Sequence, residues 1–244
     1  MNNTQKANNQ YKKSINFSLR KKEFCPFRYE RQMDCLFARL KKDFSRKKRL
    51  NVLESGCGQG WLLHYLQRFD PQQNYFGVDY VRDNVMAARK RFQRDENIKI
   101  WQGNFYHLGG KYRRFFDVVI SYKTLSWLPE YKQAMAEMMR VAKRRIYITS
   151  LFYDGDISFD IKVNHLDKKC FNYLNVYSTN EFRKFCIKRG ARRVDFINMN
   201  LDIDLPKPKN SNQIRTYTIR TKNNQNLEIT GTVLLNWKLV IVQL

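Results

Sequence analysis

The stretch that decides the fold is Val52-Leu53-Glu54-Ser55-Gly56-Cys57-Gly58-Gln59-Gly60. It opens as a short apolar run typical of a buried strand, and Trp61 to Phe69 after it has the pattern of a helix. Three of the chain's ten glycines fall between these two elements. A ligand resting on such a turn meets backbone without Cβ atoms, and the following helix offers free N–H groups and a positive end. The stretch therefore predicts a ligand-binding turn between a strand and a helix.

A second acidic residue lies at the end of the next expected strand. Asp79 follows Asn74 to Val78 and comes nineteen residues after Gly60. In an open α/β sheet, the carboxyl ends of neighbouring strands face the same crevice, so Asp79 should face the glycine turn. A carboxylate there can accept hydrogen bonds from both hydroxyls of a ribose. The alternative is that Asp79 only caps the helix that follows it.

Apolar runs and helical periodicities alternate along the chain outside this region. Strands are expected at about 50–54, 74–78, 98–101, 116–121, 145–151, 193–199 and 231–242, and helices at about 28–47, 61–69, 83–93, 129–142 and 179–188. Such alternation is typical of a parallel sheet wrapped by helices. The sequence therefore predicts an α/β fold that is closed by a terminal pair of strands.

The domain organisation follows from the stretches in which strands and helices no longer alternate. Residues 1–22 are polar and rich in Asn and Lys, which favours a flexible tail. Residues 23–244 are expected to form a single domain with an N-terminal helix. Two stretches without a clear period, at about 153–178 and 200–230, are interpreted as insertions.

Composition excludes several classes of protein. The chain has 244 residues, and no run approaches the ~18 apolar residues of a membrane span. The first residues contain no apolar segment of a secretory signal. Five scattered cysteines without a CxxC pair and three histidines predict neither a disulfide framework nor a metal site. We therefore expect a cytoplasmic globular protein.

The formal net charge is +24, and residues 1–50 alone carry fifteen basic and four acidic side chains. Such an excess suits nucleic acid, an anionic membrane face or a phosphorylated small substrate. It is equally compatible with a solvated helix face that binds nothing. Charge alone does not separate these alternatives.

The chemistry of the glycine turn limits the classes of ligand that it can bind. Its spacing is Gly-x-Gly-x-Gly rather than the Gly-x-Gly-x-x-Gly of dinucleotide folds, and Glu54 stands two residues before Gly56. A carboxylate beside the turn would repel a diphosphate and would suit a cationic ligand. The turn therefore favours a positively charged nucleoside.

These residues resemble the class I S-adenosylmethionine (SAM)-dependent methyltransferases over about residues 50–152. Residues 52–60 are similar to the family's first motif, and residues 116–121 to its fourth. The resemblance implies a Rossmann-like seven-stranded sheet, parallel with a C-terminal antiparallel strand and flanked by helices, with SAM as cofactor. It also implies cofactor-binding roles for Glu54, Gly56, Cys57, Gly58, Gly60, Asp79, Tyr80, Asn104, Phe105 and Ser121. Within that set Asp79 would bind the ribose, and Asn104 stands where the family commonly has Asp beside the adenine.

The catalytic residues are less well defined by the sequence. His107 and His165 could each lie over the crevice and act as a general base, although either could be a surface or packing residue. Tyr122 follows the fourth motif and could form a wall of the acceptor site. Tyr29 could close over the methionine end of the cofactor.

The sequence leaves three functions open for this protein. The strands at 215–218 and 231–238 loosely resemble those of sugar and capsule methyltransferases, which implies O-methylation of a small, polar, anionic acceptor of polysaccharide biosynthesis, phosphorylated or nucleotide-linked. The first alternative is a tRNA or rRNA methyltransferase whose basic N-terminal segment binds phosphates. The second is a cofactor-binding protein without catalysis, against which the intact motif residues argue.

Overall fold

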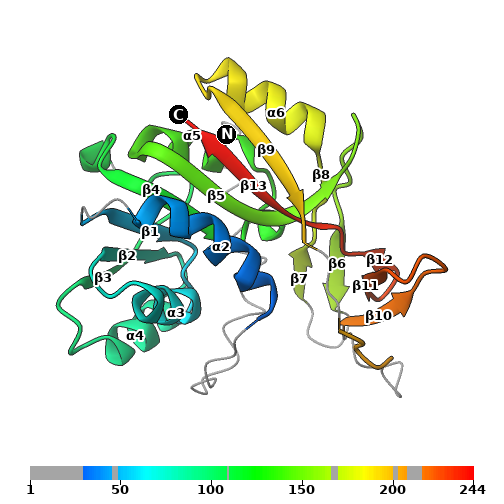
Figure 1. The fold of residues 1–244 in the computed structure, drawn as a ribbon, viewed down its shortest axis with the longest axis horizontal. Coiled ribbons are helices and arrows are strands. Elements are labelled where there is room, and N and C mark those ends of the chain that lie inside the picture. The colour runs from blue at the N-terminus through cyan, green and yellow to red at the C-terminus, as the bar shows by residue number, and fades with distance from the viewer. Residues whose placement is uncertain (1–29, 46–48, 109, 166–169, 200–202, 208–215) are drawn as a thin grey trace.

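A mixed sheet of seven strands in one path, with helices on both faces, forms the centre of this computed structural model (Figure 1). The structure describes residues 30–45, 49–108, 110–165, 170–199, 203–207 and 216–244. The expected tail at 1–22 and Tyr29 lie outside the described residues, as do parts of the expected insertion at 200–230.

The elements follow the predicted alternation in the first part of the chain. They are α2 (Gln32–Phe44), β1 (Asn51–Ser55), α3 (Trp61–Phe69), β2 (Asn74–Asp79), α4 (Arg82–Arg91), β3 (Ile98–Gln102), β4 (Phe116–Tyr122), α5 (Lys132–Val141) and β5 (Ala142–Tyr153). The second part comprises β6 (Lys162–His165), β7 (Cys170–Tyr173), β8 (Tyr177–Ser178), α6 (Thr179–Lys188), β9 (Arg193–Asn198), β10 (Thr216–Arg220), β11 (Asn226–Thr230), β12 (Val233–Leu234) and β13 (Trp237–Gln243).

The strand order is β3-β2-β1-β4-β5-β13-β9, with the two-residue β8 paired to the end of β5. The strands from β3 to β5 are parallel, and β13 runs antiparallel to both β5 and β9. The predicted fold class, a seven-stranded parallel sheet with a C-terminal antiparallel strand, is confirmed. The strand order reverses between β1 and β4, and this is where open α/β sheets form their ligand crevice.

Alternating side chains of the strands build a core on each face of the sheet. One core joins α2 and α3 to residues such as Val52, Tyr147 and Leu239. The other joins α5 and α6 to residues such as Leu53, Ile148 and Val240. Because neighbouring residues of a strand point to opposite faces, these buried strands have the continuous apolar runs that the sequence shows.

Helix α2 is fixed to the sheet by polar contacts as well as by its apolar face. Asp43 near its end pairs with Arg145 and accepts a hydrogen bond of 2.6 Å from the Tyr147 hydroxyl. At its other end, the Gln32 side-chain amide donates to Glu228 of β11 over 2.7 Å. The helix thus connects the sheet to the small β10-β11-β12 sheet.

The structure differs from the sequence expectations in two places. Residues 153–178, interpreted from the sequence as an insertion without a clear period, contain the β6–β7 hairpin and β8. The single strand expected at 231–242 is divided into β12 and β13. The division occurs because the Leu235 N–H donates to the carbonyl oxygen of Glu228 and the Trp237 N–H donates to the carbonyl oxygen of Leu235, so the chain turns between the two strands. None of the helices in the described part of the chain has the length and apolar character needed to cross a membrane.

Candidate functional site

The glycine turn between β1 and α3 is held by backbone hydrogen bonds to its neighbours. The N–H groups of Gly56 and Cys57 both donate to the carbonyl oxygen of Val78 in β2, over 2.8 and 3.0 Å. Gly56, Gly58 and Gly60 have φ values of +83°, +51° and +84°. These values lie in the left-handed region, which L side chains rarely adopt, so the three glycines fit the turn that they form.

The three glycines differ in what surrounds them. A Cβ atom on Gly56 would lie 2.6 Å from the Phe105 ring and 2.7 Å from the Thr124 side chain, and one on Gly60 would lie 2.5 Å from the Phe92 ring. A Cβ atom on Gly58 would meet nothing within 4 Å among the described residues. Gly56 and Gly60 are therefore needed for packing, whereas Gly58 leaves open space over the turn.

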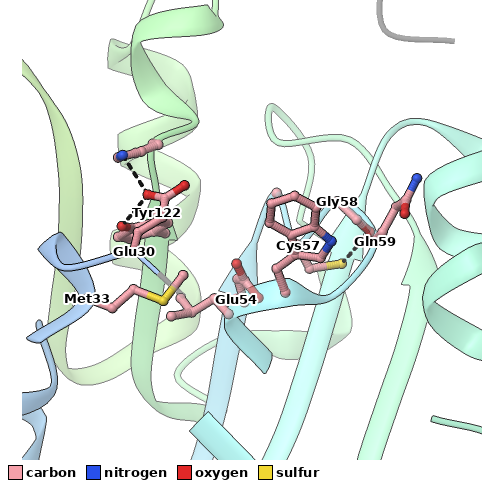
Figure 2. A pocket seen from close by; sticks show the side chains of 11 residues that line it. Glu30, Met33, Glu54, Cys57, Gly58, Gln59 and Tyr122 are labelled. Atoms are coloured by element: carbon pink, nitrogen blue, oxygen red, sulfur yellow. Dashed lines mark hydrogen bonds and ion pairs between the residues drawn. The ribbon is translucent and has the colours of Figure 1, made fainter. Parts of the chain in front are cut away.

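A cavity of about 310 Å³ lies over this turn. Its lining residues come from α2 and the segment before it, from β1, from the turn and start of α3, and from the end of β4 and the residue after it: Glu30, Met33, Glu54, Gly56, Cys57, Gly58, Gln59, Trp61, Leu62, Tyr122 and Lys123. Figure 2 shows Glu30, Met33 and Tyr122 on one side of the cavity, Cys57, Gly58 and Gln59 on the other, and Glu54 between them. The volume is at the small end of the range for ligand pockets.

Glu54 is the buried acid of the cavity, with 3% of its surface exposed. Its carboxylate accepts the N–H of Leu63 in the first turn of α3, and its Oε2 atom has no hydrogen-bond partner among the described residues. Burial, and then the nearby charge of Asp79, raise the pKa of this carboxyl well above its usual value. A cationic ligand in the cavity would favour the ionised form and would satisfy the unpaired oxygen.

Asp79 lies behind the turn and shapes it. One of its carboxylate oxygens accepts the N–H of Gly58 over 2.8 Å, and the other accepts the N–H of Val81 over 2.9 Å. Burial raises the pKa of Asp79, and these backbone hydrogen bonds oppose that rise. The bond to Val81 holds the turn before α4, but Val81 is the N-cap of α4 and no side chain caps this helix, so the capping alternative for Asp79 is wrong.

Cys57 lines the cavity, and its side chain is a protonated thiol. Burial, followed by the charges of Asp79 and Glu54, raises its pKa well above the ordinary value. It is therefore a small apolar wall residue rather than a nucleophile.

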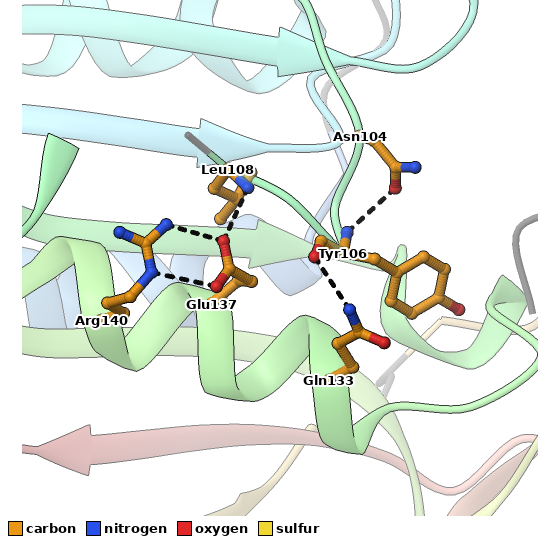
Figure 3. A network of polar contacts seen from close by, with 6 residues as sticks. All are labelled: Asn104, Tyr106, Leu108, Gln133, Glu137 and Arg140. Atoms are coloured by element: carbon orange, nitrogen blue, oxygen red, sulfur yellow. Dashed lines mark hydrogen bonds and ion pairs between the residues drawn. The ribbon is translucent and has the colours of Figure 1, made fainter. Parts of the chain in front are cut away.

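The loop after β3 is held against α5, as Figure 3 shows. Asn104 Oδ1 accepts the N–H of Tyr106 over 2.9 Å, and the carbonyl oxygen of Tyr106 accepts from the Gln133 amide over 3.1 Å. Glu137, paired with Arg140 at 2.7 Å, accepts the N–H of Leu108 over 2.9 Å. The backbone that carries Asn104 is thus fixed.

The other expected cofactor contacts lie close to the turn without lining the cavity. The Phe105 ring packs under Gly56 and is 1% exposed. Tyr80 is half-buried next to Asp79, and burial raises its pKa. Ser121, near the end of β4, is fully buried, and its hydroxyl has no partner among the described residues. Their roles toward a cofactor stay predictions.

Of the three catalytic candidates, the structure brings only Tyr122 to the cavity. His107 is in the turn after β3, bridged to Asn104. His165 is in the β6–β7 hairpin, where its Nε2 atom lies 2.6 Å from Asn172 Oδ1. Neither histidine lines the cavity, and a role for either as a general base stays a prediction.

Sequence reasoning missed several lining residues. Glu30 and Met33 belong to the segment that enters α2, and Gln59, Trp61 and Leu62 to the turn and the start of α3. Lys123, which directly follows β4, also lines the cavity and was not among the predicted site residues. For Glu30 no local signal exists, because its partners Tyr122 and Lys123 are more than ninety residues away in the chain.

Comparison with known proteins matches the part of the chain that forms this site. The family described as "Methyltransferase domain" matches residues 53–148. Over residues 53–148, the chain is similar to SAM-dependent methyltransferase domains. The match begins in β1 and ends in β5, so it contains the glycine turn, Asp79 and Tyr122.

Relatives and solved structures agree with this domain. The chain is 25% identical over 103 residues to malonyl-[acyl-carrier protein] O-methyltransferase of Bacillus anthracis, which covers 42% of this chain and 37% of that protein. It is 30% identical over 87 residues to a tRNA (guanine-N(7)-)-methyltransferase of Meyerozyma guilliermondii, covering 28% of this chain and 32% of that protein. The chain thus spans less than half the length of either curated relative.

A solved structure shares the fold along the whole chain. Magnesium protoporphyrin IX methyltransferase from Synechocystis PCC 6803, determined with bound SAM, is similar with a TM-score of 0.53 and 17% identity, over 99% of this chain and 96% of that chain. The likeness therefore extends through β9 and β13, beyond the residues of the methyltransferase domain match.

The residues of this site fit SAM, the cofactor of the family. SAM carries a sulfonium and an ammonium group, and Glu54 offers a buried carboxylate with one unpaired oxygen. The open space over Gly58 leaves room for a ligand in contact with the backbone. The N-terminal end of α3 adds free N–H groups for the carboxylate of the methionine moiety.

The contrast between the glycines gives a matched test. The Gly58→Ala variant should remain folded at a cost of about 1 kcal/mol for the left-handed backbone, and should bind SAM at least about tenfold more weakly because its Cβ atom enters the cavity. The Gly56→Ala variant should lose about 3 kcal/mol of stability, because its Cβ atom would collide with Phe105 and Thr124. Thermal denaturation and calorimetric SAM titration measure the two effects. Wild-type SAM affinity in Gly58→Ala would show that the cofactor does not contact Gly58.

Proposed function

We propose that this protein transfers the methyl group of SAM to an oxygen atom of a small anionic acceptor. The observation that carries the proposal is the cavity itself. The glycine turn and the unpaired Glu54 oxygen line it, and so does Lys123, the residue that follows β4. A site for a cationic donor and a positive group for an anionic acceptor thus line one cavity.

On the cofactor side, each residue would have a defined task. Bound SAM supplies a methyl group that its sulfonium makes electrophilic. Glu54 would bind the positive methionine end, and Gly58 would allow close contact with the backbone. Asp79 would accept hydrogen bonds from the ribose hydroxyls, and Asn104 would accept one from the adenine amino group.

On the acceptor side, the chain would act mainly by positioning. A carboxylate or phosphate oxygen has a free lone pair, so its methylation requires no proton to be removed. This agrees with a cavity that neither His107 nor His165 lines. Holding the acceptor oxygen in line with the methyl group could supply several kcal/mol of the barrier. The O-methyltransferase activity of the Bacillus relative supports an oxygen acceptor.

The acceptor could be a phosphorylated or nucleotide-linked metabolite of polysaccharide biosynthesis, as the strands of the C-terminal region suggested. No comparison supports this finer assignment, and it rests on that loose resemblance alone. A small acceptor of this kind would be methylated inside the cavity.

The second candidate function is RNA methylation. The net charge of +24 and the tRNA methyltransferase among the relatives favour it. Most of the basic N-terminal segment lies outside the described residues, so this alternative depends on solution experiments.

Transfer of a radiolabelled methyl group from SAM tests both functions. The protein is incubated with pools of carboxylic acids, sugar phosphates, nucleotide-sugars and polar lipids, and with bulk tRNA. Gly58→Ala serves as a control with a blocked cofactor site. We expect label in a small anionic acceptor. Label in tRNA alone, with binding that weakens steeply as salt rises, would refute the small-molecule proposal in favour of the RNA alternative.

A further inference from the structure

One carboxylate oxygen at the cavity receives two strong hydrogen bonds. Glu30 Oε2 accepts from the Tyr122 hydroxyl over 2.8 Å and from the Lys123 ammonium over 2.6 Å (Figure 2). The three side chains all line the cavity over the glycine turn. An anionic oxygen is therefore already bound at this place, and the protein supplies it from its own chain.

The two donors belong to the sheet, whereas the carboxylate does not. The Lys123 N–H bonds to Thr149 of β5 over 2.9 Å, and its ammonium lies 5.0 Å from the centre of the Trp237 ring of β13. Glu30 precedes α2, and its side chain is 35% exposed, against 25% for that of Lys123. The donors are thus held by strand ends, and Glu30 reaches them from a neighbouring segment.

The other charged side chains near Lys123 are compatible with the replacement of the Glu30 carboxylate by an anion of the ligand. Glu228 of β11 is the other acid near Lys123: burial raises its pKa, the Lys123 charge lowers it and Glu30 raises it. Glu228 is bonded to Gln32 over 2.7 Å, and Glu54 faces the same cavity. Lys123 is the basic residue among those that line the cavity, so an anion that replaces Glu30 there meets its ammonium group.

We propose that Tyr122 and Lys123 form a two-donor binding site for an anionic oxygen of the methyl acceptor, and that Glu30 fills this site until the acceptor displaces it. The ligand is a carboxylate or a phosphate, which share the required oxygen chemistry. The assignment to the acceptor rests on the proposed methyltransferase function. Glu30 would act as an internal competitor that the correct acceptor must replace, which disfavours uncharged molecules.

The effect of such a competitor can be measured. If Glu30 fills the site about nine-tenths of the time, its removal should strengthen anion binding about tenfold, because apparent affinity scales with the fraction of competent sites. Glu30→Gln removes the charge with little change in size. Lys123→Met removes the ammonium, and Tyr122→Phe removes only the hydroxyl donor.

The experiment titrates sodium malonate and sodium phosphate, at constant ionic strength, into the full chain with and without saturating S-adenosylhomocysteine. Glu181→Gln and Lys184→Met are matched controls, since both residues are exposed on α6 and change the net charge equally. We expect about tenfold tighter binding of one anion in Glu30→Gln, at least tenfold weaker binding in Lys123→Met, a smaller loss in Tyr122→Phe, and wild-type binding in both controls. Malonate and phosphate distinguish a carboxylate from a phosphate acceptor.

Three outcomes would overturn the inference. The first is anion affinity in Glu30→Gln equal to that of Glu181→Gln, and the second is anion affinity in Lys123→Met equal to that of Lys184→Met. The third is methyl transfer in Lys123→Met equal to that of the wild type, which would refute the assignment of the anion site to the acceptor and leave the proposed function. If Lys123→Met does not fold, as judged by circular dichroism, Lys123→Gln replaces it under the same criteria. Anion binding as expected, without methyl transfer to any acceptor, would refute the proposed function and leave the anion site.

Discussion

Replacing Asp79 with alanine is expected to weaken SAM binding about a hundredfold or more while the protein stays folded. Hydrogen bonds from two ribose hydroxyls to a carboxylate contribute roughly 1.5–3 kcal/mol each, and about 2.7 kcal/mol corresponds to a hundredfold change in affinity. The variant also loses the acceptor that holds the Gly58 N–H in place. The free energy of unfolding should change less than the free energy of SAM binding. Burial raises the pKa of Asp79, which means that the ionised carboxylate is less favourable in the folded protein than in the unfolded chain.

Calorimetric titration with SAM, together with a thermal denaturation curve, measures both quantities. Asp83→Ala is the matched control, since Asp83 is an exposed acid in the first turn of α4. We expect the control to bind SAM like the wild type. Unchanged SAM affinity in Asp79→Ala would refute the ribose assignment, and with it the central element of the proposed cofactor site.

Replacing Glu54 with glutamine is expected to change stability and cofactor affinity in opposite directions at neutral pH. Burial and Asp79 raise the pKa of Glu54 well above its ordinary value of 4.5. The folded state thus binds this proton more tightly than the unfolded state. The stability that comes from the protonated form is complete below pH 4.5 and is lost as the pH rises toward the raised pKa. Glu54→Gln removes this loss, so its Tm at pH 8 should exceed that of the wild type by roughly 2–4 °C, which corresponds to about 1 kcal/mol.

The same substitution should weaken SAM binding at least about tenfold, because a neutral amide replaces the charge that faces a cation. Differential scanning calorimetry at pH 5 and pH 8, and SAM titration at both values, measure the effects. Glu96→Gln, at an exposed position, is the control. A Glu54→Gln protein whose Tm falls with rising pH as steeply as that of the wild type would contradict the assignment of the buried charge to Glu54.

The fold was predictable where the decisive signals are local. Trp61–Phe69 is helical over the expected residues; β1 is shifted from its expected position by one residue, and β2 is longer than expected by one residue. An apolar run next to glycines, followed by a helical period, fixes these elements from within a short window. The same holds for α6, where the Ser178 side chain accepts the N–H of Glu181 and Gly190 follows the helix.

The elements that depend on distant partners were not predictable in this way. The hairpin of β6 and β7 has no buried alternation of its own, and β12 ends where Leu235 turns to bond with Glu228. The candidate site shows the same division. Glu54, the glycines and Tyr122 come from contiguous motifs, whereas Glu30 and Met33 reach the cavity only because α2 packs across the sheet.

The position of β13 between β5 and β9 bears on the order in which the chain acquires its structure. In the main sheet, β9 is paired only with β13 among the described strands, and the paired residues of β13 and β5 are at least 86 positions apart in the sequence, as at Leu151 and Trp237. Closing so long a loop is entropically costly and slow. The five parallel strands can therefore assemble first, and β9 can be secured only in a late step, when β13 arrives. Substitutions in β13 should then act mainly on the rate of unfolding, and those in β1 and β4 on the rate of folding.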